Sequence, residues 1–459
     1  MSKLRILILG QNVDPTDVSV PLVGYSHAAA LAEIHDVTLV VGSPVEDRVR
    51  SAKANFRSIE VVRMAMLERM RLWAFRRIFK SNYESQALTA FSYPFVVAFE
   101  WFAWRQMRRR ILAHEFDAVM RVVPVTAVLP SPFAFFLRKT QIPFVIGPIN
   151  GGLPWPPGFS QLQKQKEWVS SLRYMYAYLP FARSTYRYAA AIIVASSNTR
   201  AEFSAYRDKV FFIPENAIHR SLCCEDTRQQ KASDRLNLIF VGGLVPRKAC
   251  DLALRAAAPL LKNGKAHFTV VGNGPERDRL KELAKSLGIE DSVCFSGWLS
   301  HAEVLKRMQQ SDVFVFPSVR EFGGGVVFES LASGAVPLVV DFGGPGDTVF
   351  PKIGFKVPMS NEDDIVEQMG RVLNQLAIDR SLLTEVRKQG MTYAREHLTW
   401  NAKAQDTTRI LNWVVRKGPK PELVPPRLAA AMDSHRDDPG HSVGPRPATG
   451  ATGVLANLP

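Results

Sequence analysis

The sequence predicts an α/β protein in which two doubly wound parallel-sheet domains follow one another, and three observations lead to this. The chain has 459 residues, which is too long for one ordinary core and suits two domains of roughly 150 to 200 residues. Short buried-strand patterns alternate with helical patterns, as in βαβ units. A polar and charged segment at 221–235 separates two such series. We expect each series to form a parallel sheet with helices on both faces.

The N-terminal series begins with a buried strand at 4–9, which reads Leu-Arg-Ile-Leu-Ile-Leu and ends at Gly10. A helical pattern at 26–34 and a second strand at 37–41 follow, so the chain opens as a βαβ unit. Further strands of this series are expected at 118–123, 143–146, 191–195 and 211–213.

The C-terminal series repeats this alternation and ends in a single long helix. Its strands are expected at 238–241, 268–271, 293–295, 313–316 and 336–340, with helices between them that include 276–287 and 302–309. An amphipathic helix is expected from Trp400 onward, available to pack across the domains. Two such halves in tandem place a ligand cleft between them, at the carboxyl ends of both sheets.

Composition narrows the class of protein. With 46% hydrophobic and 22% charged residues the chain is globular. The four cysteines are spaced for neither a disulfide framework nor a zinc site. The longest apolar stretch, 91–104, is broken by Pro94 and Glu100 and falls short of the roughly 20 residues that span a bilayer. The apolar run at 6–9 is too short for a signal sequence, so we expect a cytoplasmic protein.

The segment with the clearest chemical content follows the predicted strand at 313–316. It contains two glutamates and three consecutive glycines: Glu321, Gly323, Gly324, Gly325 and Glu329. The glycines allow close backbone approach, and a helix that begins there offers unpaired N–H groups and a positive dipole end to a phosphate. The carboxylates would repel that phosphate, so hydroxyls of a ribose or a sugar are their better ligands. The alternative is a glycine-rich turn with two solvated glutamates.

Two cations follow the predicted strand at 238–241. The chain there reads Gly-Gly-Leu-Val-Pro and continues with Arg247 and Lys248. A guanidinium and an ammonium near the cleft would stabilise the negative charge that grows on a departing diphosphate. The alternative is an Arg–Lys pair on a solvated surface.

Together these motifs resemble the retaining glycosyltransferases of family 4, which have the two-domain GT-B fold. The resemblance covers most of residues 1–416 and is strongest at 238–346. The shared motifs occur in the family's order: the Gly-Leu-Val-Pro-x-Lys turn, Val271-Gly-Asn-Gly-Pro-Glu276, Phe295-Ser-Gly-Trp-Leu299, Phe316-Pro-Ser, and two glutamates separated by seven residues.

The resemblance implies a GT-B fold, with two Rossmann-like domains facing each other across a cleft, a C-terminal cross-over helix and a disordered tail. We expect an acceptor domain at 1–220, a nucleotide-sugar donor domain at 235–399, a helix at 400–416 that packs back on the N-terminal domain, and the tail at 417–459. The tail is rich in proline and poor in apolar residues.

The implied activity is the retaining transfer of a hexose from a UDP- or GDP-sugar to a saccharide or lipid-linked saccharide, in polysaccharide or glycolipid biosynthesis. The resemblance implies that Glu321 binds hydroxyls of the donor sugar, that Glu329 binds the ribose and that Lys248 binds the diphosphate. Backbone amides near Gly324 and Gly325 would meet the same phosphates, and the backbone near Leu299 the base. Gly24 matches part of a glycine loop near the donor phosphate and the acceptor.

The chain departs from the family pattern in three places. Gly243 stands where the family has a phosphate-binding arginine, and Arg247 is the candidate to replace it. Val23 precedes Gly24 in place of a second glycine. The family's histidine after a middle strand has no match near Met120 and Arg121.

No cofactor and no catalytic metal are expected, because the chain has no apolar-flanked Asp-x-Asp. The helix dipole, Arg247 and Lys248 would then stabilise the departing diphosphate, while the sugar passes through an oxocarbenium-like state.

The net charge of +15 indicates an anionic partner. Two basic, aromatic segments, 63–80 and 101–110, read as surfaces that can lie on an anionic membrane and bring the enzyme to a lipid-linked acceptor. In that case the protein is peripheral on the inner face of the plasma membrane. The alternative is that their apolar residues pack on the N-terminal sheet. Nucleic acid is not expected as a partner, since no nucleic-acid-binding motif accompanies the charge.

A loop at 146–158 that is rich in glycine and proline follows a predicted strand, and we expect Asn150 and Trp155 in it to shape the acceptor site. A merely structural turn is the alternative. The rival function is a GT-B nucleotide-sugar epimerase or hydrolase, which would use the same cleft without an acceptor.

Overall fold

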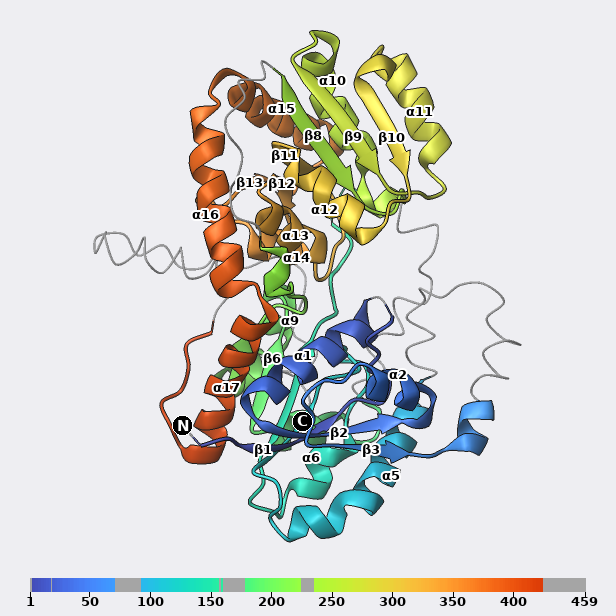
Figure 1. Ribbon diagram of the computed structural model, residues 1–459, viewed down its shortest axis with the longest axis vertical. Helices are drawn as coiled ribbons and strands as arrows, with labels where there is room; N and C mark the ends of the chain where they lie inside the picture. The colour runs from blue at the N-terminus through green and yellow to red at the C-terminus, as the bar shows by residue number, and fades with distance from the viewer. Residues whose placement is uncertain are drawn as a thin grey trace.

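Two parallel sheets, one in each half of the chain, form the protein (Figure 1). The computed structural model describes residues 2–17, 19–70, 92–156, 158–159, 178–223 and 235–423. The N-terminal sheet has the strand order β3-β2-β1-β4-β5-β6-β7. Its strands are β1 (Arg5–Leu9), β2 (Asp36–Gly42), β3 (Ser58–Val62), β4 (Ala118–Arg121), β5 (Phe144–Ile149), β6 (Ala191–Val194) and β7 (Val210–Phe212).

The C-terminal sheet has the order β10-β9-β8-β11-β12-β13, and its strands also pair in parallel. The strands are β8 (Leu236–Val241), β9 (Ala266–Val271), β10 (Val293–Gly297), β11 (Val313–Phe316), β12 (Val336–Asp341) and β13 (Phe355–Pro358). In both sheets the strand order reverses beside the first strand, as in Rossmann-like folds. The predicted tandem of parallel α/β domains is therefore confirmed.

Helices occupy the crossovers between the strands, and three more follow the last strand, β13. In the N-terminal half they are α1 (Val20–Ile34), α2 (Glu46–Ser51), α5 (Tyr93–Leu112), α6 (Pro132–Leu137), α8 (Ala182–Tyr188) and α9 (Ser197–Glu202). In the C-terminal half they are α10 (Cys250–Lys262), α11 (Arg277–Ser286), α12 (His301–Gln309), α13 (Gly325–Ser333), α14 (Gly343–Thr348), α15 (Glu362–Ile378), α16 (Ser381–His397) and α17 (Trp400–Arg416).

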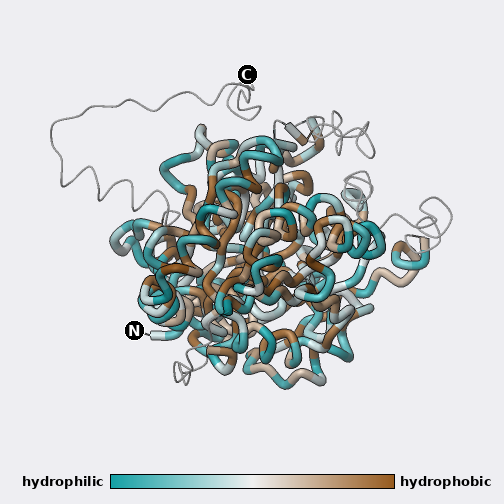
Figure 2. The backbone as a smooth tube through the Cα atoms, turned by 90° about the horizontal axis from the view of Figure 1, so that it is seen from above, coloured by the Kyte–Doolittle hydropathy of each residue, from teal (hydrophilic) through white to brown (hydrophobic). Residues whose placement is uncertain are grey.

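Both faces of the N-terminal sheet are buried. Along β1, Ile6 and Ile8 belong to the core on one face, and Leu7 and Leu9 belong to the core on the other. This is why the strand is apolar after Arg5 and does not alternate with polar residues. Hydrophobic segments accordingly lie inside the molecule, with hydrophilic ones around them (Figure 2). The C-terminal sheet has a core of its own.

Helix α17 packs on the N-terminal domain although it follows the C-terminal domain in sequence (Figure 1). Its Ile410 and Leu411 are fully buried in the core that also contains α1. Two hydrogen bonds of 2.9 Å join the helices, from His27 Nε2 to Thr407 Oγ1 and from His35 Nε2 to Thr408 Oγ1. Residues 417–423 continue along β7, where the Phe212 amide donates to the Leu423 carbonyl at 3.0 Å. The rest of the predicted tail, 424–459, lies outside the described residues.

Sequence analysis missed β3 and β13, which are the edge strands of the two sheets beside β2 and β12. Their composition explains the omission, because β13 reads Phe-Lys-Val-Pro and β3 has serine and glutamate among its apolar residues. Such strands bury less surface and carry charges and proline, so their sequences do not resemble buried strands.

Candidate functional site

The three glycines lie where a strand ends and a helix begins, as predicted. Strand β11 ends at Phe316, and α13 starts at Gly325 with Gly324 as its N-cap. Gly324 has φ of 60°, a left-handed conformation that favours glycine, and a β-carbon there would lie 3.2 Å from Pro345. The loop thus presents a helix N-terminus and close backbone to the space before α13.

The structure brings Lys248 and Glu321 together although 73 residues separate them in sequence. Lys248 ends a short 3-10 turn after β8, and its Nζ forms an ion pair with Glu321 Oε2. Both side chains are mostly buried, and the ammonium lies 4.9 Å from the centre of the Phe316 ring. A cation and a carboxylate therefore meet beside the glycine loop.

Arg247 fixes the same turn through its backbone. Its carbonyl accepts hydrogen bonds from Ser318 Oγ at 3.2 Å and from the Val319 amide at 3.0 Å, which joins the turn after β8 to the loop after β11. At Gly243, a β-carbon would meet no atom within 4 Å among the residues that the structure describes. The position that the family fills with arginine thus has room for a side chain.

Glu329 lies on α13 and meets a histidine that sequence analysis missed. His301 is the first residue of α12, and its Nε2 lies 3.0 Å from Glu329 Oε1. This hydrogen bond raises the pKa of His301 above its usual range. The only signal in the sequence is the Ser300 and Glu303 capping box, which locates the start of α12 but not its neighbour. Leu299 precedes this cap and packs partly buried on the C-terminal core.

A second residue that sequence analysis missed is a carboxylate, Glu215, which comes from the N-terminal half. It follows β7 and accepts a hydrogen bond from Asn150 Nδ2 to its Oε2 at 2.7 Å. Beside it, Asn216 lies against the glycine loop, since a β-carbon on Gly323 would stand 2.3 Å from Asn216 Nδ2. Loops of both domains therefore meet at Gly323. A side chain at this position would clash with Asn216.

The loop that contains the two predicted acceptor residues packs against the C-terminal domain. Arg320 Nε donates to the Leu153 carbonyl at 3.2 Å, and its guanidinium lies 4.8 Å from the Trp155 ring. Asn150 is almost fully buried in its bond to Glu215. These contacts place Asn150 and Trp155 at the junction of the domains, and contact with an acceptor stays a prediction.

A buried carboxylate also joins the domains behind this loop. Asp347 on α14 accepts hydrogen bonds from the Ser197 amide at 2.7 Å and from Ser197 Oγ at 2.6 Å. Ser197 is the first residue of α9 in the N-terminal domain. The domains are thus held together by polar contacts at the back of the site.

Gly24 lies inside helix α1 and not in the loop that sequence analysis expected. A β-carbon at this position would stand 2.4 Å from Val123 and 3.0 Å from Val13. The glycine therefore lets α1 approach the segment after β4 closely. The helix is also longer than the predicted 26–34, since it begins at Val20, with Pro21 in its first turn.

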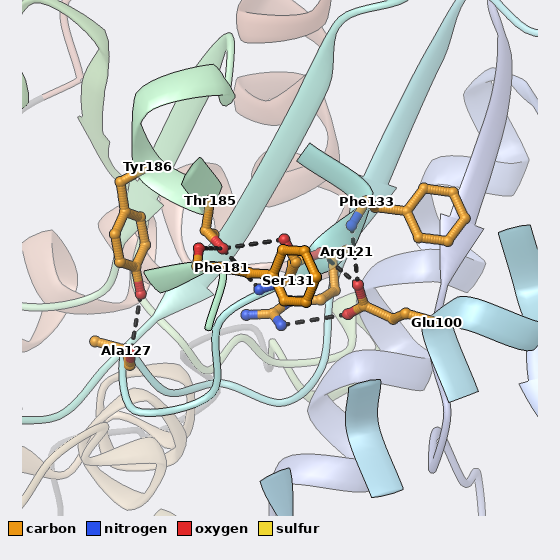
Figure 3. Close-up of polar contacts among 8 residues, drawn as sticks. All are labelled: Glu100, Arg121, Ala127, Ser131, Phe133, Phe181, Thr185 and Tyr186. Carbon is orange, nitrogen blue, oxygen red and sulfur yellow. Dashed lines mark hydrogen bonds and ion pairs between the residues drawn. The ribbon is translucent and has the colours of Figure 1, made fainter. Parts of the chain in front are cut away.

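The family's histidine has no counterpart at the end of β4. A buried arginine, Arg121, stands there instead (Figure 3). Arg121 points into the N-terminal domain, where its Nη1 lies 3.4 Å from Glu100 Oε1. Glu100 also accepts from Ser131 Oγ at 2.5 Å, and burial raises its pKa. Ser131 and Thr185 exchange two further hydrogen bonds. This cluster joins the end of β4 to α5 and to the start of α6.

Neither predicted membrane segment is wholly apolar or wholly buried. In 101–110, Trp101 is 49% and Phe102 39% exposed on α5, while Trp104 packs on Phe133 and Phe136. In 63–80, residues 65–70 are helical and expose two methionines, and 71–80 lie outside the described residues. Within the described ranges, no helix is long and apolar enough to cross a membrane. In the same part of the chain, no three His, Cys, Asp or Glu residues are grouped to hold a metal ion.

Part of the chain matches a known family in sequence. Residues 225–390 match the model of Glycosyl transferases group 1. An uncharacterized glycosyltransferase of Methanocaldococcus jannaschii is 28% identical over 178 residues, which are 39% of this chain and 45% of that protein. A Mycobacterium tuberculosis protein named GDP-mannose-dependent alpha-(1-6)-phosphatidylinositol monomannoside mannosyltransferase is 26% identical over 252 residues, which are 49% of this chain and 63% of that one. The matches thus span about half of these relatives' lengths.

Solved structures match over nearly the whole chain. HepE of Anabaena, solved in complex with UDP, has a TM-score of 0.59 at 16% identity and is covered over its full length by 89% of this chain. A glycosyltransferase from Rickettsia africae has a TM-score of 0.58 at 13% identity and is covered over its full length by 91% of the chain. At such identities the likeness concerns the fold. The chain therefore has the GT-B fold, and its C-terminal domain matches the glycosyltransferase group 1 family.

Proposed function

We propose that the protein is a retaining glycosyltransferase that moves a hexose from a UDP- or GDP-sugar to a saccharide or lipid-linked saccharide. One observation carries the proposal: Lys248 and Glu321 meet beside the glycine loop at the start of α13, in a domain that matches glycosyltransferases. That arrangement offers a cation and a helix N-terminus to a diphosphate, and a carboxylate to hydroxyl groups.

In the proposed donor complex, each group takes the ligand that suits its charge. Lys248 and the amides of residues 323–325 bind the diphosphate, and Arg247 adds the charge that Gly243 does not supply. Glu321 then accepts hydrogen bonds from sugar hydroxyls, and Glu329 from the ribose. The base lies at the backbone of Leu299.

The proposed chemistry is electrostatic and needs no metal. When the bond from the anomeric carbon to the diphosphate breaks, negative charge grows on the leaving group, and Lys248, Arg247 and the α13 dipole stabilise it. Two relatives support this donor class. The mycobacterial mannosyltransferase is named for GDP-mannose, and HepE was solved with UDP.

Turnover of a panel of UDP- and GDP-sugars, with and without a membrane lipid extract, tests the proposal. Nucleotide release that needs the extract and is lost in Glu321→Ala and Glu329→Ala is expected. Glu367→Ala is the matched control, since Glu367 is an exposed glutamate that pairs with Arg371 on α15. Release that needs no acceptor would instead favour an epimerase or hydrolase, and no release with any donor would contradict the proposal.

We further propose that the N-terminal domain contacts an anionic membrane through an aromatic surface on α5, α6 and the residue before α8. Its rings touch one another, with Trp101 5.7 Å from Phe136 and Phe136 6.3 Å from Phe181. Exposed arginines surround these rings at 105, 108, 109, 138 and 183. Aromatic rings among arginines are typical of surfaces that lie in the headgroup region of a bilayer.

This surface lies at the end of the N-terminal domain that is turned away from the C-terminal domain (Figure 1). Contact there would leave the cleft between the domains accessible for a lipid-linked acceptor at the inner face of the plasma membrane. Flotation with vesicles of phosphatidylglycerol is expected to recover the wild type and much less of a Trp101→Ala, Phe102→Ala variant. Equal recovery of both proteins, or of neither, would contradict membrane contact at this surface.

A further inference from the structure

His301 contacts one of the proposed donor-binding carboxylates, and the proposed donor complex gives it no role. It is the first residue of α12 and comes directly after the loop that follows β10. Its Nε2 lies 3.0 Å from Glu329 Oε1, and Glu329 belongs to α13, 28 residues further along the chain. The start of α12 thus reaches the carboxylate that is proposed to bind the ribose.

The chemistry of this pair determines which atom donates. An ionised carboxylate only accepts hydrogen bonds, so the proton of this bond is on His301 Nε2. The bond raises the pKa of His301, and the negative charge of Glu329 raises it further. Glu329 is the charged residue of α13, and β8, which also packs on α12, has none. The other charged residues of α12 itself are Glu303, Lys306 and Arg307.

The pair is open to solvent and to a ligand. The side chain of His301 is 57% exposed and that of Glu329 is 25% exposed. Trp298, in the same loop after β10, is 81% exposed. Leu299, where the base is proposed to lie, stands between Trp298 and the start of α12. A nucleoside can therefore approach this edge of the C-terminal domain and reach the carboxylate.

The two helices do not depend on this bond to pack. Met308 of α12 and Leu331 of α13 are buried in the same core, and the capping box of Ser300 and Glu303 fixes the start of α12. An exposed pair contributes little to stability. The bond instead restricts the side chain of Glu329, which would otherwise lose rotamer freedom when a ligand binds it.

We propose that His301 is a positioning residue for the donor, and that it holds Glu329 by Oε1 so that Oε2 accepts from the ribose hydroxyls. This rests on the proposed transferase function, in which Glu329 binds the ribose. His301 keeps its bond while the ribose donates to the other oxygen, so the carboxylate is ordered before the donor arrives. The effect is on affinity and on recognition of the ribose, because the diphosphate separates the ribose from the bond that breaks.

Calorimetry tests this with the nucleoside diphosphate whose sugar supports wild-type turnover, and with its 2′-deoxy and 3′-deoxy analogues. The wild type should bind the parent nucleotide more tightly than the analogue that lacks the hydroxyl bound by Glu329. His301→Phe keeps a ring without a donor, and it should weaken binding of the parent about three- to tenfold and bring it close to that of the analogue. In His301→Gln, the amide donates to Glu329, so most of the affinity and of the discrimination should return.

Steady-state kinetics separate positioning from chemistry. In both variants kcat at saturating donor should stay within about twofold of the wild type, while the donor KM follows the calorimetric affinity. The KM of the wild type should rise between pH 6 and pH 8.5, because His301 loses its positive charge and binds Glu329 less strongly. This rise should be smaller in His301→Gln, whose amide does not titrate.

His397→Gln is the matched control, since His397 is 58% exposed on α16 and its Nε2 lies 3.8 Å from Glu396 Oε2. It should change neither affinity nor discrimination. His301→Ala, which also removes the donor, serves if phenylalanine prevents folding.

Two results would overturn the role of His301 while leaving the transferase in place. One is full discrimination in a folded His301→Phe when Glu329→Gln has lost it, even if the melting temperature of His301→Phe falls. The other is equal binding of the parent and both analogues by the wild type, which would remove the ribose contact itself. Absence of nucleotide binding and of turnover in the wild type would overturn the proposed function, and this role with it.

Discussion

Replacing Lys403 with methionine should make the N-terminal domain more stable at neutral pH. Burial lowers the pKa of Lys403 from its ordinary value of 10.5 to about 7, because the charged form loses its hydration. Between these two values the unfolded chain holds a proton that the folded protein does not, so stability rises with pH across this range. From the pKa values, the penalty is about 4 kcal/mol at pH 7 and about 1 kcal/mol at pH 9.5.

Methionine has a similar length and no charge, so it removes the penalty at both pH values. It also removes the hydrogen bond to the Glu215 carbonyl, a loss of about 1–3 kcal/mol for a buried acceptor. Lys403→Met should therefore gain roughly 1–3 kcal/mol at pH 7 and gain little or lose slightly at pH 9.5. The pH-dependent part, about 3 kcal/mol, corresponds to about 6–12 °C in the melting temperature of a domain of this size.

Differential scanning calorimetry of both proteins at pH 7.0 and pH 9.5 measures this difference, with Lys388→Met on the exposed side of α16 as the control. A melting temperature that falls equally at both pH values would refute the reasoning, since Lys403 would then be charged and paired in the folded protein.

Three further predictions concern the donor site and the buried cluster. Gly243→Arg should fold normally, because a side chain there meets open space, and should lower the donor KM several-fold in steady-state kinetics; a rise in KM would contradict it. Glu321→Gln should bind UDP more tightly by calorimetry, about fivefold for roughly 1 kcal/mol, because Lys248 loses its competing partner; weaker UDP binding would count against this. Glu100→Leu should cost about 3–5 kcal/mol in calorimetry by leaving Arg121 buried and unpaired, whereas unchanged unfolding would exclude a charged pair.

Most of the strands that sequence analysis found are apolar and almost fully buried, although β10 is only partly buried. β11 and the part of β1 after Arg5 are apolar because helices cover both faces, and that pattern is visible without any structure. β3 and β13 escaped because they mix polar or charged residues with apolar ones. Gly24 was misplaced for a different reason, since a glycine that lets two elements pack closely looks the same in sequence as a glycine in a loop.

The candidate site also contains residues whose contacts the sequence could predict and residues whose contacts it could not. Glu321 and Lys248 belong to short motifs that follow strands of one sheet, so their meeting could be predicted from the sheet topology. The neighbours of Glu215 could not, because Lys403 lies 188 residues further along the chain and a lysine on an amphipathic helix is ordinarily solvated. The burial of Lys403 depends on how α17 crosses between the domains, and no local sequence pattern predicts that crossing.

The ion pairs in the site indicate an order of events on donor binding. Lys248 is paired with Glu321, and His301 contacts Glu329, so both carboxylates already have a partner before a donor arrives. In the proposed donor complex, the diphosphate takes Lys248 from Glu321, and Glu321 Oε2 then becomes available to sugar hydroxyls. In this proposal, the phosphate that binds Lys248 therefore frees the carboxylate for the sugar. A free sugar should bind weakly without the nucleotide, since it offers Lys248 no anion in exchange.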